Sequence, residues 1–241
     1  AGFDNIDLDE IKRKNILVSN ARDIFSITIA EDIISKISIF NRHTMEYVDQ
    51  MKKKEWRQIS NEHEIWNSVI GICGTGSIGQ ETAKRLSAFE PKKIIGYRNK
   101  NQEVPYFDEI YTGISGLKEV ISQSDYLIIA LPLNQDTEYL FDKKMLSLMK
   151  KEALLINVAR GKVIVQEDLI SILEKRQIRG AALDVTDPEP LPKDSLLWSL
   201  DNCFITAHNA SSSMYMKTRL FDLTIDNLER YINDQDLKFL L

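Results

Sequence analysis

The chain has 241 residues, of which 43% are hydrophobic, and its formal net charge is −5. This length suits one large domain or two unequal ones. The acidic balance and the scattered Lys and Arg residues give no footprint for nucleic acid. No apolar run approaches the length that crosses a membrane. From the charge and the run lengths together, we predict neither a nucleic-acid partner nor a membrane partner. We also predict no bound metal.

The two cysteines bear on the cellular compartment. Cys73 lies inside a predicted strand and Cys203 precedes another apolar run, so the pair does not suggest a disulfide framework. A reducing environment fits this usage. We therefore predict a cytoplasmic location.

The first 67 residues predict two helices and a short strand. A short helix is expected over 7–14 and a strand over 16–20. Residues 26–47 carry Ile29, Ile33, Ile37 and Phe40 at helical spacing, which predicts one long helix. Such a helix could bridge domains or subunits, or it could simply pack in the core. In and beside the polar connector over 52–67, both His43 and His63 are predicted to lie on the surface.

An apolar strand over 68–73 then breaks into glycines before a helix over 80–86. Gly74 allows a tight turn, Gly76 removes a side chain so that backbone amides can approach a pyrophosphate, and Gly79 lets the helix pack closely on the strand. The phosphates would lie at the positive helix N-terminus. Glycine turns after strands are common, but the flanking strand and helix favour dinucleotide binding here.

A second strand over 92–97 ends at Arg98, where the adenosine ribose of a dinucleotide would lie. A carboxylate at this place accepts hydrogen bonds from both ribose hydroxyls and selects NAD, whereas Arg suits a 2′-phosphate. We therefore predict NADP or NAD as the cofactor, with NADP slightly favoured. The alternative interpretation of Arg98 is a solvated basic loop.

Strands and helices continue to alternate along the rest of the chain. Strands are expected over 106–110, 125–131, 153–158, 181–185 and 203–206, and helices over 116–122, 142–149 and 166–176. This alternation predicts an α/β fold with a doubly wound parallel sheet. One last amphipathic helix is expected over 212–233.

Three polar residues follow apolar strands, where such a sheet presents side chains to a ligand crevice. Arg160 can fork onto a carboxylate, and Glu189 can fix the tautomer of His208 and stabilise its imidazolium. Together with hydride from a nicotinamide cofactor, this set would reduce a 2-oxo acid. Taken singly, they could be a surface arginine, a turn residue and a helix cap. Their joint placement favours the catalytic interpretation.

The chain resembles the D-isomer-specific 2-hydroxyacid dehydrogenases. Five segments carry the resemblance: residues 1–7, 71–79, 157–161, 183–192 and 206–210. It implies a Rossmann sheet with parts of a smaller flavodoxin-like substrate domain at both ends. The implied division is a substrate-domain remnant over 1–20, a dinucleotide-binding domain over 21–211, and a C-terminal helix over 212–241 that returns to the substrate domain.

The resemblance also implies roles for individual residues. Arg160, Glu189 and His208 would be the catalytic trio, and backbone amides around Gly2 and Phe3 would help Arg160 to hold the substrate carboxylate. The resemblance implies that Asp184 meets the nicotinamide carboxamide. The other implied cofactor contacts are Ser77 and Ile78 at the pyrophosphate and Pro132, Thr137 and Val158 along the cleft.

The resemblance implies a homodimer, with the helix over 26–47 contributing to the interface. It has two local departures: Arg98 stands where NAD-using members have an acidic residue, and Ala207 replaces a frequent proline. Family members begin with a further substrate-domain segment, so we expect that the sequence is incomplete or truncated upstream.

The leading hypothesis is an oxidoreductase that transfers hydride between NAD(P)H and a small 2-oxo acid or D-2-hydroxy acid. A non-catalytic, corepressor-like protein that binds NAD(P)(H) is the alternative. The trio of Arg160, Glu189 and His208 favours the enzyme. The substrate side chain stays open among glyoxylate, hydroxypyruvate, phosphohydroxypyruvate and longer 2-oxo acids.

Overall fold

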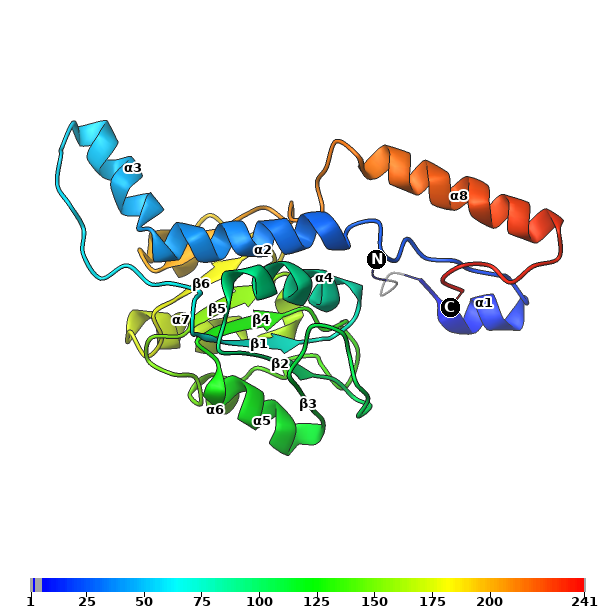
Figure 1. Cartoon of the computed structure of the whole chain (residues 1–241), viewed down its shortest axis with the longest axis horizontal. Coiled ribbons are helices and arrows are strands. Elements are labelled where there is room, and N and C mark those ends of the chain that lie inside the picture. Colours follow the sequence, from blue (N-terminus) through cyan, green and yellow to red (C-terminus); the bar gives the residue numbers. More distant parts are fainter. Residues whose placement is uncertain (1, 3–5, 241) are drawn as a thin grey trace.

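The computed structural model describes residue 2 and residues 6–240, and its central feature is a parallel sheet (Figure 1). In this described part, the seven strands pair in the order β3-β2-β1-β4-β5-β6-β7. The strands are β1 (Val69–Cys73), β2 (Lys93–Tyr97), β3 (Glu109–Tyr111), β4 (Tyr126–Ile129), β5 (Leu154–Asn157), β6 (Gly180–Leu183) and β7 (Cys203–Ile205).

The strand order is that of a doubly wound sheet, as the sequence predicts. The chain winds outward from β1 to β3, returns to pair β4 with β1, and then winds the other way to β7; every pairing is parallel. The winding reverses between β1 and β4. In sheets of this kind, ligands bind outside the carboxyl ends of the strands at this reversal.

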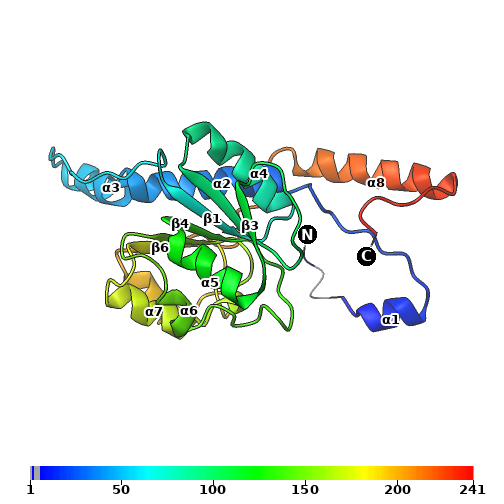
Figure 2. The same cartoon turned by 60° about the horizontal axis from the view of Figure 1, so that its bottom comes forward.

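Helices cover both faces of the sheet (Figures 1 and 2). The helices are α1 (Leu8–Arg13), α2 (Ser26–Asn41), α3 (Thr44–Lys53), α4 (Ser77–Leu86), α5 (Gly113–Gln123), α6 (Lys143–Leu146), α7 (Gln166–Glu174) and α8 (Met216–Ile232). Side chains of α2 and α4 share one core cluster with the sheet. Those of α5, α6 and α7 share the other. The strands are therefore buried on both faces, which explains their nearly continuous apolar sequences.

Helix α2 crosses the sheet with its isoleucines turned inward. Ile33 and Ile37 are fully buried and Ile29 is 8% exposed, so the apolar stripe seen in the sequence does face the core. At its far end, Asn41 donates through Nδ2 to the hydroxyl of Tyr126 at 2.8 Å. This bond ties the end of α2 to the start of β4.

Two segments from opposite ends of the sequence, which include α1 and α8, lie together away from the sheet (Figures 1 and 2). Ser19 forms an isolated antiparallel bridge with Leu240, and the Asn20 amide donates to the Phe239 carbonyl at 3.1 Å. Asn227 of α8 donates through Nδ2 to the Ser19 hydroxyl at 2.8 Å. The tail after α8 therefore joins the segment after α1, and the division at residues 20 and 211 stays a prediction.

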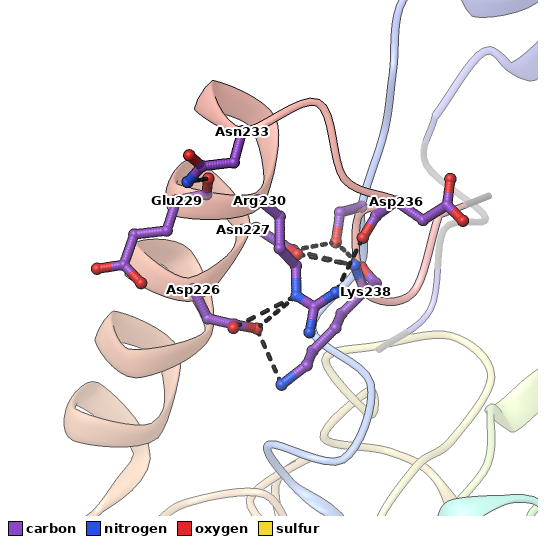
Figure 3. A network of polar contacts seen from close by, with 8 residues as sticks. Asp226, Asn227, Glu229, Arg230, Asn233, Asp236 and Lys238 are labelled. Atoms are coloured by element: carbon purple, nitrogen blue, oxygen red, sulfur yellow. Dashed lines mark hydrogen bonds and ion pairs between the residues drawn. The ribbon is translucent and has the colours of Figure 1, made fainter.

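A polar network folds this tail back onto α8 (Figure 3). Lys238 and Arg230 both pair with Asp226, at 2.9 and 3.3 Å, and the Lys238 amide donates to Asn227 Oδ1 at 2.8 Å. These cations hold the pKa of Asp226 below its usual value, with Lys238 contributing most. The network occupies one side of α8, while its apolar side chains, such as Phe221 and Ile232, are largely exposed.

Four predictions about local structure are wrong. The strand expected over 16–20 is absent: Ser19 alone makes a bridge there, because this segment has no extended partner along its length. The helix expected over 26–47 ends at Asn41, and His43 adopts a left-handed backbone with φ of 50° that interrupts the helical hydrogen bonds before α3. The strand expected over 106–110 begins only at Glu109, because Tyr106 also has positive φ and lies in a turn.

The fourth error concerns the two histidines expected on the surface. Both are half-buried, and His43 Nε2 is a buried atom without a hydrogen-bond partner in the described part of the chain. Burial lowers the pKa of His63, and the nearby Arg179 lowers it further. Within residues 6–240, no helix is long and apolar enough to cross a membrane.

Candidate active site

Two of the motif glycines are required by the packing of the protein itself. Gly74 has φ of +106°, and a Cβ there would lie 2.4 Å from the Ala130 carbonyl oxygen at the end of β4. A Cβ on Gly79 would lie 2.1 Å from the Gly74 carbonyl oxygen. Backbone therefore fills both places, and the turn after β1 can approach β4 and α4 this closely only with glycine.

Gly76 is different, because no packing contact within the protein requires a glycine at this position. Its backbone has φ of −75°, and a Cβ there would meet no atom within 4 Å. Gly76 caps α4 without a side-chain hydrogen bond, and Thr75 Oγ1 beside it is a buried atom with no partner among the described residues. An open place beside the amides of Ser77 and Ile78, at a helix N-terminus, fits a phosphate group. The residues present thus fit a dinucleotide.

Arg98 directly follows β2, where the sequence predicts it. Its amide donates to the Tyr111 carbonyl at 3.1 Å. With the Gln102 amide oriented so that its oxygen faces the guanidinium, Arg98 Nη1 donates to Oε1 at 2.7 Å. No ion pair of Arg98 is recorded within the described ranges. The half-buried guanidinium is thus held at the strand end by a neutral partner.

The residues expected along the cofactor cleft follow β4 and β5. Pro132 is exposed, and Val158 is 7% exposed with its amide donating to the Ile129 carbonyl at 3.2 Å. The Thr137 hydroxyl donates to the Pro132 carbonyl at 2.6 Å and accepts from the Asn134 amide at 2.9 Å. Thr137 therefore shapes the loop after β4. A direct contact between these residues and a cofactor stays a prediction.

His208 and Glu189 come together, as the sequence predicts. Nδ1 of His208 lies 2.8 Å from Oε2 of Glu189. The other oxygen of Glu189 accepts from the Thr186 amide at 3.1 Å, which fixes the carboxylate. The imidazole is 48% exposed, so a substrate can reach it. Because the carboxylate engages Nδ1, Nε2 is the ring nitrogen suited to exchange a proton with a ligand.

Arg160 lies in a turn that the neighbouring loops define. Asn157 accepts from the Ala159 amide at 3.0 Å and donates to the Arg160 carbonyl at 3.1 Å, which orders the turn after β5. A Cβ on Gly161 would lie only 1.9 Å from the Thr186 carbonyl oxygen. The turn that carries Arg160 therefore packs directly on the segment that leads to Glu189.

Asp184 is a buried carboxylate at the start of the same region. It is 3% exposed and accepts from the amides of Asn209 and Ala210, both at 3.0 Å, and from the Thr206 hydroxyl at 2.5 Å. The family resemblance implies a contact with the nicotinamide carboxamide for this residue. The recorded contacts instead hold the loop that carries His208, and the cofactor contact stays a prediction.

Sequence reasoning missed Lys36, the charged partner of Asp184. Lys36 of α2 is 1% exposed, pairs with Asp32, and lies 3.9 Å from Asp184 Oδ1. The available signal was a lysine within an apolar helical stripe, between Ile33 and Ile37, with an aspartate four residues before it.

Gly2 and Phe3 are the two remaining residues expected at the substrate. Gly2 is exposed, while Phe3 lies outside the described residues, so their predicted contact with a substrate carboxylate is untested.

Burial raises the pKa of Cys203 to about 12 and raises that of Cys73 further. Neither thiol is therefore suited to act as a nucleophile near neutral pH.

A doubly wound sheet with a glycine turn at its reversal point and a histidine–carboxylate pair at the same edge is typical of a nicotinamide-dependent oxidoreductase. The model of the NAD-binding domain of the D-isomer specific 2-hydroxyacid dehydrogenases matches residues 34–210. The chain belongs to this family.

Named relatives agree with this family. Glyoxylate reductase from Pyrococcus furiosus is 32% identical over 235 residues, which cover 94% of this chain and 69% of the relative. The human glyoxylate reductase/hydroxypyruvate reductase is 32% identical over 234 residues, which cover 94% of this chain and 70% of the relative.

Solved structures share the fold. An acyclic imino acid reductase in complex with NADPH and D-Arg has a TM-score of 0.90 at 29% identity, covering 100% of this chain and 76% of that one. The NADPH-dependent glyoxylate/hydroxypyruvate reductase from Sinorhizobium meliloti, in complex with NADP and sulfate, has a TM-score of 0.84 at 26% identity. That match covers 94% of this chain and 72% of the reductase.

The contrast between Gly74 and Gly76 generates a prediction. Gly76→Ala should leave the free energy of unfolding within about 0.5 kcal/mol of the wild type, because the new methyl group meets no protein atom. It should weaken NADPH binding by roughly tenfold or more, which corresponds to about 1.4 kcal/mol. Gly74→Ala should instead destabilise the fold by about 2 kcal/mol or more, through its positive φ and the clash with Ala130.

Urea unfolding and fluorescence titration with NADPH measure the two effects separately. If Gly76→Ala binds NADPH as tightly as the wild type, the glycine turn does not approach the pyrophosphate.

Proposed function

We propose that this protein is an NADPH-dependent reductase of small 2-oxo acids, which it converts to D-2-hydroxy acids. The observation that carries the proposal is the 2.8 Å pair between His208 and Glu189, at the sheet edge that also carries the glycine turn. The intact pair favours an enzyme over a corepressor-like protein that only binds the cofactor. The activities for which the relatives are named, glyoxylate and hydroxypyruvate reduction, support substrates of this size.

In this proposal, each residue has one task. Arg160 binds the substrate carboxylate through its planar guanidinium and polarises the neighbouring carbonyl. Glu189 orients the imidazole of His208 and stabilises its protonated form. His208 gives its proton to the carbonyl oxygen as the oxygen gains negative charge, and in the oxidative direction it removes the hydroxyl proton. The nicotinamide cofactor, when bound, supplies the hydride.

The acid role of His208 predicts a selective loss of turnover. His208→Ala should lower kcat for glyoxylate reduction by about 10²- to 10⁴-fold, the usual contribution of a general acid. The dissociation constant of NADPH should stay within about twofold, because the imidazole acts on the substrate. Stopped-flow absorbance at the NADPH band and a binding titration measure the two quantities.

Glu189→Gln provides a graded comparison, since it keeps a hydrogen-bonding side chain but removes the charge that stabilises the imidazolium. Its kcat should lie between the values of the wild type and His208→Ala. His63→Ala serves as the matched control, because this histidine lines a separate pocket before β1 and should leave kcat unchanged. Equal turnover by His208→Ala and the wild type would remove the assigned role.

We propose that Arg98 makes NADPH the preferred cofactor. The support is its place at the end of β2 and its neutral partner Gln102, which leaves the guanidinium charge available to a 2′-phosphate. The two structural neighbours described above contain NADPH and NADP.

Arg98→Ala should raise KM for NADPH by roughly tenfold, because it removes charge-assisted hydrogen bonds to the 2′-phosphate. A tenfold change corresponds to about 1.4 kcal/mol. KM for NADH should change by less than about twofold, since NADH carries no phosphate at this place. Lys92→Ala, just before the opposite end of β2, is the control and should alter neither value. Parallel losses with both cofactors would argue against a role in selecting the phosphate.

We also propose that the protein forms a homodimer through α2 and α3. Helix α3 projects beyond the sheet (Figure 1). It exposes Val48 and Met51, and the connector after it exposes Trp56 completely. Such apolar side chains gathered on a projecting arm favour burial against a partner.

Sedimentation at micromolar concentration should give twice the chain mass for the wild type, and Met51→Asp/Trp56→Ser should shift the protein toward the monomer. The exposed substitution Tyr106→Ser, beyond β2, is the control. A wild type that sediments as a monomer would contradict the dimer.

A cytoplasmic location, which the two unpaired thiols favour, completes the proposal.

A further inference from the structure

A buried charge cluster lies beneath the loop that carries His208. Lys36 lies in α2 with only 1% of its side chain exposed, on the buried face that also carries Ile29, Ile33 and Ile37. Lysine is almost never fully buried unless it is paired. Here it pairs with Asp32 one helical turn earlier and lies 3.9 Å from Oδ1 of Asp184.

Asp184 connects this cluster to the catalytic loop. Its carboxylate holds the Thr206 hydroxyl on one side of His208 and the amides of Asn209 and Ala210 on the other. Its carbonyl accepts from the His208 amide at 2.8 Å. His208 has φ of 49°, a left-handed backbone that is uncommon for a residue other than glycine. The hydrogen bonds of Asp184 hold the residues on both sides of this conformation.

The cluster contains two carboxylates and one ammonium group. Burial raises the pKa of Asp32, and the charge of Asp184 raises it further, while Lys36 acts in the opposite direction. The two carboxylates therefore compete for the same cation. Asp32 is the more exposed of the two, at 23% against 3%, and Lys36 is a cation within ion-pair distance of the buried Asp184 carboxylate.

We infer that Lys36 is a positioning residue for catalysis: through its contact with Asp184 it holds the 206–210 loop in the conformation that keeps His208 against Glu189. This inference rests on the proposed function for its catalytic consequence only. Lys36 acts on the orientation of the proton donor and touches neither substrate nor cofactor in this role. Its effect should therefore fall on kcat.

The test compares two variants that differ only at Lys36. Asp32→Asn keeps Lys36 beside Asp184, and its kcat should stay within about twofold of the wild type. Asp32→Asn/Lys36→Met removes the cation without leaving Asp32 charged, so the double variant should still fold. Its kcat should fall by about tenfold to a hundredfold, the cost of a misplaced catalytic group. KM for the 2-oxo acid and Kd for NADPH should stay within about twofold.

Comparison of the same two variants also distinguishes this positioning role from a merely structural one. If Lys36 serves only to neutralise Asp32, the double variant will turn over as fast as Asp32→Asn, and the inference is overturned. A uniform rise in KM and Kd with unchanged kcat would overturn it as well, because that result would indicate a general loosening of the fold.

A readout without turnover makes the outcome independent of the proposed function. The chain has three histidines, so their imidazole resonances can be resolved and assigned by NMR. Between Asp32→Asn and the double variant, the His208 resonance should shift, while that of His63 should not. A shift of His208 in a protein that reduces no 2-oxo acid would keep the positioning role and refute the proposed activity. An unshifted His208 would refute the positioning role even in an active enzyme.

Discussion

Parallel pairing of all the strands in the sheet is the constraint on which the rest of the structure depends. Because every strand runs the same way, each segment that leaves a strand emerges at one edge. The glycine turn after β1, Arg98 after β2, Arg160 after β5 and His208 after β7 all lie along this edge. The burial of both faces by helices then leaves this edge as the place where polar side chains gather.

Close backbone packing turns this shared edge into a defined geometry. The clash that a Cβ on Gly74 would make with Ala130 shows how tightly β1 meets β4, and Gly161 shows the same for the loops after β5 and β6. Side chains hold these loops further, because Asn157 and Asp184 form hydrogen bonds with backbone amides and carbonyls of the loops. A site built on loops thus gains the rigidity of the sheet.

Several errors of the sequence interpretation have a common cause. Helical periodicity continues past Asn41 in the sequence, but one left-handed residue, His43, divides the helix. Residues 16–20 have strand-like composition, yet strand formation needs a neighbouring edge, and only Ser19 finds one in Leu240. Local patterns record which side chains would be buried. They do not record which partner segment will be present.

The sequence by itself determined the alternation of strands and helices from residue 68 onward, the doubly wound sheet and the glycine turn, and it singled out Arg160, Glu189 and His208 as candidates for the site. These follow from local chemistry: apolar runs, glycines at fixed spacing and polar residues directly after strands. Tertiary structure alone decided that Gly76 faces open space while Gly74 and Gly79 face backbone, and that Lys36 meets Asp184 across the fold. Such relations depend on distances between segments far apart in the chain, which no local pattern contains.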